Sequence, residues 1–126
     1  MLERKVAGLI IKSLRDDPRF GSCSVEVKVA KGKTLPKSAL KGHQRRALEL
    51  STTKGGIYHK LSDAGACFGQ LPFDGVVLKE AEAYLAIYYE TKPKCEIWVL
   101  DIGAVPDGSI GIEYARGHGQ NLTISK

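Results

Sequence analysis

The run from Ser24 to Val29 alternates between polar and apolar residues, and this period constrains the fold more than any other feature of the chain. In an extended strand, one face carries Val25, Val27 and Val29, and the other carries Ser24, Glu26 and Lys28. The run therefore predicts a strand that buries its valines and presents a carboxylate beside an ammonium. The plainer interpretation is that Glu26 and Lys28 lie on the solvated face of an antiparallel strand.

Elements on both sides of this strand are expected from periodicity and turn residues. A helix over residues 2–14 precedes the strand at 22–30, and a second helix over 37–50 follows it, with Leu40, Ala47 and Leu48 on its buried stripe. Extended segments are expected at 57–61, 73–78, 83–89, 95–102 and 122–124. This order predicts an α/β fold with a mixed sheet flanked by helices, and a parallel crossover from the first strand through the second helix to the strand at 57.

Length and composition limit the domain count and the compartment. A chain of 126 residues with 43% hydrophobic residues can bury one core, so we expect one domain over residues 1–126. No stretch approaches eighteen apolar residues, which predicts a soluble, intracellular protein without a membrane partner. Three widely spaced cysteines fit reduced thiols better than zinc ligands or disulfides.

Positive charge is concentrated directly after the alternating run. Residues 28–46 contain seven basic residues and no acidic one, although the whole chain carries 19 basic and 14 acidic residues. Such a segment predicts a surface that binds a phosphate backbone, and a merely solvated face is the alternative.

Glu26 and Lys28 together suggest phosphodiester chemistry. Magnesium prefers carboxylate oxygens and keeps several waters, so one or two acids and a substrate phosphate suffice to hold it. A neighbouring ammonium can orient the water or neutralise developing charge.

The residues around this pair resemble a known family. Val25–Lys28, Lys31–Pro36, the His43-Gln44 pair and Leu48 resemble the core of the PD-(D/E)xK nuclease superfamily, and within it the RecU-type Holliday-junction resolvases and small phage-encoded relatives. The segments Ile57–Lys60 and Pro72–Asp74 also resemble the phage group, so the resemblance covers about residues 22–90. It implies a restriction-endonuclease-like core and a cytoplasmic location in a bacterial or phage-infected cell.

The resemblance implies a role for each matching residue. Glu26 would be a metal ligand, Lys28 the catalytic lysine and Gln44 a supporting polar group, with magnesium or manganese as the cofactor. Gln44 has a structural alternative, because it lies one helical turn from Leu40 and Leu48 and can simply border the buried stripe. The expected nucleic-acid contacts are Lys31, Lys33, Lys37, Lys41, His43, Arg45 and Arg46, and Glu3 would add an outer-shell carboxylate.

The second acid of the family pattern has no clear position. The superfamily usually places an aspartate upstream on a neighbouring strand, but Asp16 and Asp17 precede Pro18 in an expected loop. Asp74 has the better local context, provided that its strand is a sheet neighbour of the Glu26 strand, and a turn aspartate is its alternative. A degenerate motif of Asp74 with Glu82 and Tyr84 ranks third, because tyrosine cannot supply the charge of lysine.

These observations predict a magnesium-dependent endonuclease that acts on DNA, including branched DNA, as a homodimer. The first alternative is a non-catalytic nucleic-acid-binding module that has the fold and lacks a metal ligand. The second is a protein-interaction module, such as a phage accessory or inhibitor protein.

Overall fold

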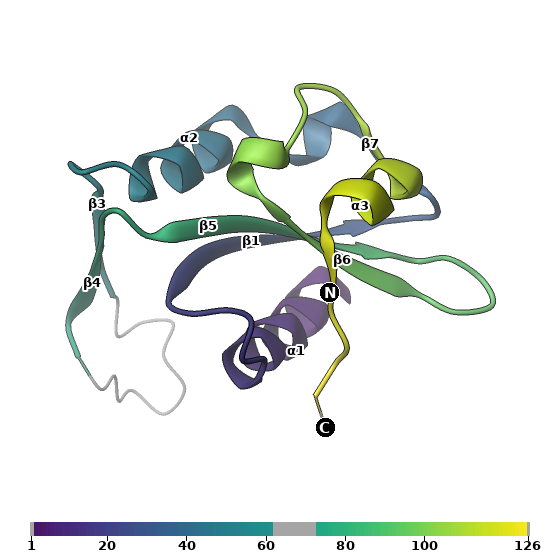
Figure 1. The fold of residues 1–126 in the computed structure, drawn as a ribbon, viewed down its shortest axis with the longest axis horizontal. Coiled ribbons are helices and arrows are strands. Elements are labelled where there is room, and N and C mark those ends of the chain that lie inside the picture. Colours follow the sequence, from purple (N-terminus) through teal and green to yellow (C-terminus); the bar gives the residue numbers. More distant parts are fainter. Residues whose placement is uncertain (1, 62–72, 126) are drawn as a thin grey trace.

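The computed structural model describes residues 2–61 and 73–125 (Figure 1). Its elements in chain order are α1 (Leu2–Asp16), β1 (Cys23–Ala30), β2 (Thr34–Leu35), η1 (Lys37–Ala39), α2 (Gly42–Ser51), β3 (Ile57–Lys60), β4 (Gly75–Leu78), β5 (Glu82–Tyr89), β6 (Glu96–Asp101), η4 (Ile102–Ala104), β7 (Ile110–Gly111), α3 (Ile112–His118) and β8 (Gln120–Asn121). The strand expected at 22–30 and the helix expected at 2–14 are confirmed. The expected α/β fold with a mixed sheet is confirmed as well.

The main sheet has the order β1-β5-β6-β8. Strand β1 pairs in parallel with β5, with Glu26 opposite Leu85, and the remaining pairs are antiparallel. The expected crossover to the strand at residue 57 is wrong, because β3 pairs with β4 in a separate two-stranded sheet. Three of the four β3 residues are exposed, whereas β5 has five consecutive buried residues and lies in the interior of the main sheet, next to β1. The crossover therefore runs from β1 through α2 and the β3–β4 hairpin to β5.

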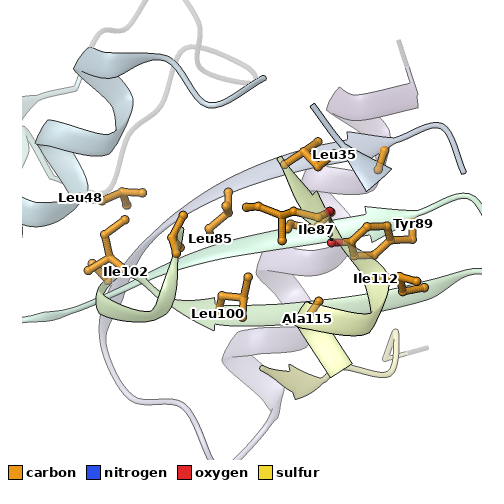
Figure 2. Close-up of a cluster of buried hydrophobic side chains, with 13 residues drawn as sticks. Leu35, Leu48, Leu85, Ile87, Tyr89, Leu100, Ile102, Ile112 and Ala115 are labelled. Carbon is orange, nitrogen blue, oxygen red and sulfur yellow. Dashed lines mark hydrogen bonds between the residues drawn. The ribbon is translucent and has the colours of Figure 1, made fainter. Parts of the chain in front are cut away.

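Helices cover both faces of this sheet (Figure 1). Helix α1 lies on one face, where Val6, Ile10 and Leu14 pack against Val27 and Tyr84. On the opposite face lie α2, η4 and α3. The core on that face includes Leu35, Leu48, Leu85, Ile87, Tyr89, Leu100, Ile102, Ile112 and Ala115 (Figure 2). Apart from Glu82, which is exposed, and Tyr88, which is half-buried, the residues of β5 are thus buried.

The second helix begins later than its apolar pattern indicates. Lys37–Ala39 form a 3₁₀ turn, and α2 starts at Gly42. The side-chain oxygen of Gln44 accepts a hydrogen bond from the backbone N–H of Lys41 at 3.0 Å, which fixes the first turn at this point. Leu48 is buried as expected, but Ala47 is exposed, because the buried side of the shorter helix runs through Leu48 and Ser51.

The C-terminal segment differs most from expectation. Residues 112–118 form α3, which buries Ile112 and Ala115, and the last strand lies at Gln120–Asn121 rather than at 122–124. In the described ranges, no helix has the length and apolar character needed to cross a bilayer.

Candidate active site

The polar face of β1 lies beneath α2, not against solvent. Glu26 pairs in register with Leu85 and Lys28 with Ile87, and both of these β5 residues belong to the core on the α2 side. Lys28 is therefore buried at 9% exposure, while the side chain of Glu26 keeps 29% of its surface exposed. The interpretation of the pair as residues on the open face of an antiparallel strand is wrong.

Three side chains form a polar cluster at this position. The Nζ of Lys28 lies 3.3 Å from Oε2 of Glu26, and the side-chain amide of Gln44 donates to the same oxygen at 3.2 Å. Because the ammonium is buried, its contact with the carboxylate offsets part of the cost of removing that charge from water. The Glu26–Lys28–Gln44 cluster thus joins β1 to α2 at the edge of the core.

The start of α2 fixes the orientation of the Gln44 amide. Its Oε1 accepts from the Lys41 backbone N–H, so Nε2 is the end that points to Glu26. Gln44 therefore faces the Glu-x-Lys strand, as expected. It also lies beside the buried stripe of α2, as the structural alternative for this residue proposed.

A second polar bridge holds α2 on β1. The hydroxyl groups of Ser24 and Ser51 lie 2.8 Å apart, and Ser51 donates to the carbonyl of Leu48 at 2.7 Å. Because the single proton of Ser51 is used there, Ser24 is the donor to Ser51. Gln44 and Ser51 are about two helical turns apart, so the two bridges set both the position and the direction of α2 over the strand.

An open space of about 620 Å³ adjoins the cluster. Glu26 and Gln44 line it together with His43, and the hairpin contributes Tyr58 and His59 from the other side. Sequence reasoning gave no role at this site to Tyr58 or His59. Only the hairpin geometry, which places β3 against α2 rather than in the main sheet, brings them to Glu26.

Asp74 was expected as the second acid only if its strand neighboured the Glu26 strand, and it does not. It precedes β4, and β4 pairs with β3, not with β1. Its backbone carbonyl accepts from the N–H of Leu61 at 2.8 Å, and the residue lines a separate groove with Lys60 and Val77. His59 lines that groove and also the Glu26 space, so the hairpin separates the two acids.

Asp16 and Asp17, the other candidates for the second acid, lie on the α1 side of the sheet. Asp16 bonds Arg15 at 2.9 Å, and Asp17 bonds Arg19 at 2.7 Å, both near the end of α1. These arginine hydrogen bonds hold the pKa of each carboxyl below its ordinary value. Glu3 lies exposed in the first turn of the same helix.

The degenerate motif also faces away from Lys28. Tyr84 packs edge-on against Phe20 in the α1-side core, and its hydroxyl donates to Glu82. Burial first, and then this hydrogen bond, raise the pKa of Tyr84, which keeps the phenol neutral. Tyr84 of the third possibility therefore lies on the α1 side of the sheet, away from the Glu26–Lys28–Gln44 cluster.

Most of the expected phosphate-binding residues are exposed. They are Lys31, Lys33, Lys37, Lys41, His43 and Arg46. Arg45 is different, because its guanidinium donates to the carbonyl oxygens of Val105 at 3.4 Å and Pro106 at 2.6 Å. It follows Gln44 by one residue and so points to a different side of α2, where it anchors the segment after η4.

The donor set fits a hard cation in kind, but the described part of the chain supplies one acid to it. Magnesium binds carboxylate oxygens with waters and phosphate, and Glu26 offers such an oxygen at the wall of an open space. Within residues 2–61 and 73–125, no three side chains of histidine, cysteine, aspartate or glutamate gather closely enough to hold a metal ion. Phosphate oxygens would have to complete the coordination.

Comparison with known proteins adds no relative: the chain matches no protein-family model, no curated protein and no solved structure.

Proposed function

We propose that the chain is a metal-dependent DNA endonuclease with a restriction-endonuclease-like core, as its resemblance to the PD-(D/E)xK superfamily implies. The observation that carries the proposal is the Glu26–Lys28–Gln44 cluster, in which a helix glutamine contacts the acid of the Glu-x-Lys strand. The parallel connection from β1 through α2 to β5 supports it, because it covers the acid and the lysine with that helix. Branched DNA such as a Holliday junction is the proposed substrate.

Each member of the cluster has a distinct task in hydrolysis of the phosphodiester. Glu26, whose Oε2 contacts both Lys28 and Gln44, would hold the cation with its carboxylate. A bound Mg²⁺ supplies charge neutralisation and a more acidic water. The Lys28 ammonium stabilises the negative charge that develops on the phosphate, and Gln44 holds the carboxylate in one orientation.

The test is cleavage of branched and linear DNA with magnesium. We expect Glu26→Gln and Lys28→Met each to lose cutting by at least about a hundredfold, the size usual for a group that acts only in the transition state. Glu113→Gln is the matched control, because Glu113 is 89% exposed on α3. Full cutting by Glu26→Gln contradicts the proposal.

Symmetric cutting of a junction requires two sites, so a homodimer is part of this proposal. Sedimentation of the free protein and of its junction complex measures the stoichiometry, and one copy per junction contradicts this part.

A second candidate is a DNA-binding module that does not cut. The observation that favours it is the one carboxylate that residues 2–61 and 73–125 bring to the cluster, with Asp74 in a separate groove. The exposed lysines of residues 31–41 need no magnesium to contact phosphates. Salt-dependent binding that is unchanged by magnesium, with no cleavage by the wild-type chain, would favour this candidate over the nuclease.

A further inference from the structure

The β3–β4 hairpin presents an apolar surface to solvent. Tyr58 and Val77 are direct cross-strand partners, and they are 84% and 71% exposed. The neighbouring pair, Ile57 and Leu78, is half-buried, because alternate pairs of a hairpin face opposite sides. We call Tyr58 and Val77 the Tyr58 platform. The ring of Tyr58 is therefore available for contact with a ligand.

Backbone hydrogen bonds join the base of the hairpin to the end of α2. The backbone N–H groups of Glu80 and Ala81, which follow β4, donate to the carbonyls of Thr53 at 2.8 Å and Ser51 at 3.0 Å. Both acceptors are at the C-terminal end of α2, the helix whose N-terminal turn carries Gln44. The hairpin stands at the end of the molecule where α2 ends (Figure 1). Tyr58 lines the Glu26 space and also the groove beside Asp74, where Val77 lies, so the platform stands where the two spaces meet.

Three lysines and two acids surround the platform. Lys60 lies two residues after Tyr58 and so shares its face of the strand, and Lys54 and Lys79 are exposed at the base of the hairpin. Two acids, Asp74 and Glu80, are also exposed there, so the local balance is only weakly positive. Much of the positive charge available to phosphates comes from residues 31–46, which lead into α2 and across its first turn.

We propose that the Tyr58 platform stacks on an unpaired base of DNA whose backbone lies along the Glu26 space. Aromatic side chains stack on bases of any sequence, and flanking lysines hold the backbone. In an uninterrupted duplex, the neighbouring base pairs cover each base face, so the ring reaches a base only where pairing is broken. The preferred substrate class is therefore DNA with unpaired bases, such as a bubble or an open branch point. This inference rests on the proposed function only in taking DNA as the ligand.

Fluorescence anisotropy without metal tests the proposal separately from cleavage. The probes are a labelled duplex and the same duplex with a short central run of mismatched bases, measured in chelator. We expect Tyr58→Ala to weaken binding of the mismatched DNA by about tenfold, the size of one lost base–aromatic stack, with little effect on the duplex. Tyr58→Phe keeps the ring and should retain the wild-type preference. Because Tyr58 is almost fully exposed, both variants should fold, and circular dichroism checks this.

A 2-aminopurine base in the mismatched run reports stacking directly, because its fluorescence should fall on binding of the wild-type protein and not of Tyr58→Ala. Equal affinity of wild type and Tyr58→Ala for both DNAs overturns the inference. A change of oligomeric state in Tyr58→Ala also overturns it, and would assign the platform to contact between two copies. Loss of cleavage in Glu26→Gln with ring-dependent binding intact supports both proposals, whereas ring-dependent binding without any cleavage supports the inference and contradicts the nuclease.

Discussion

Gln44 joins the first turn of α2 to Glu26 on β1, accepting from the Lys41 backbone N–H with one end of its amide and donating to the carboxylate with the other. This single side chain therefore fixes where the helix begins and how the acid is oriented. Its two contacts predict that changes at Gln44 affect catalysis more than folding.

Replacement of Gln44 by alanine should lower DNA cleavage by about 10–100-fold, the range typical when a partner that orients a metal ligand is removed. The free energy of unfolding should fall by only about 1 kcal/mol, because one hydrogen bond to the backbone and one to a partly exposed acid are lost. Cleavage rates over a magnesium titration and urea unfolding measure the two effects. The matched control is Gln120→Ala, at an exposed position on β8. If Gln44→Ala cleaves DNA as fast as the control does, the role of Gln44 is purely structural.

Lys28 and Glu26 should be energetically coupled. Lys28→Met leaves a half-buried carboxylate without its ion-pair partner, and we expect a loss of about 1–3 kcal/mol in the free energy of unfolding. Glu26→Gln in the same chain removes the unpaired charge, so the double variant should recover part of this loss. A double-mutant cycle measured by urea unfolding gives the coupling energy, expected to be at least about 0.5 kcal/mol. Additive effects would show that the 3.3 Å pair contributes nothing to folding.

The sequence was sufficient to predict local structure where one period of polar and apolar residues dominated a segment. The alternation from Ser24 to Val29 predicted β1 and its two faces correctly, because burial of one face and polarity of the other set the register. It could not show that the polar face lies under α2, since a covered face with an ion pair and a solvated face carry the same residue types. That distinction depends on which strand pairs with β1, and the partner, β5, lies more than fifty residues later in the chain.

The missed elements have similar causes. Helix α3 buries only Ile112 and Ala115, too short a stripe to indicate a helix among the surrounding glycines. Asp74 is separated from Glu26 because β3 and β4 form a sheet of their own. No local pattern in Ile57–Lys60 indicates that this strand is outside the main sheet. The contact of Gln44 with Glu26 was expected from the family resemblance rather than from periodicity.

Gly56 should be the most sensitive glycine in the hairpin. Its φ of +66° is in the left-handed region, and a Cβ there would lie 2.8 Å from the Cα of Lys79 and even closer to the carbonyl oxygen of Leu78. Gly56→Ala should therefore lower the free energy of unfolding by at least about 2 kcal/mol, since backbone strain and a clash add. Gly55→Ala is the matched control, because its Cβ meets nothing within 4 Å, and it should be neutral or slightly stabilising. Equal stability of the two variants, measured by urea unfolding, would contradict this geometry.

Glu96 should make the stability of the C-terminal region depend on pH in the acid range. The hydrogen bond from Arg116, followed by that from the Trp98 indole, lowers the pKa of Glu96 from 4.5 to about 2. A carboxyl with a lowered pKa in the folded state stabilises above its unfolded value, so this contribution is present above pH 4.5 and is lost as the pH falls through about 2. Because the Arg116 side chain is 45% exposed, we expect a contribution of about 1 kcal/mol rather than the full value of the shift.

Glu96→Gln separates this contribution from general acid unfolding. The difference in unfolding free energy between wild type and Glu96→Gln should be about 1 kcal/mol near neutral pH and should vanish near pH 2, where the wild-type carboxyl takes up its proton. Glu113→Gln is the control, because Glu113 contacts the same arginine at 3.3 Å but is 89% exposed, so its effect should be small at every pH. A difference for Glu96→Gln that persists unchanged at pH 2 would show that Glu96 stabilises the fold through contacts that do not depend on its charge.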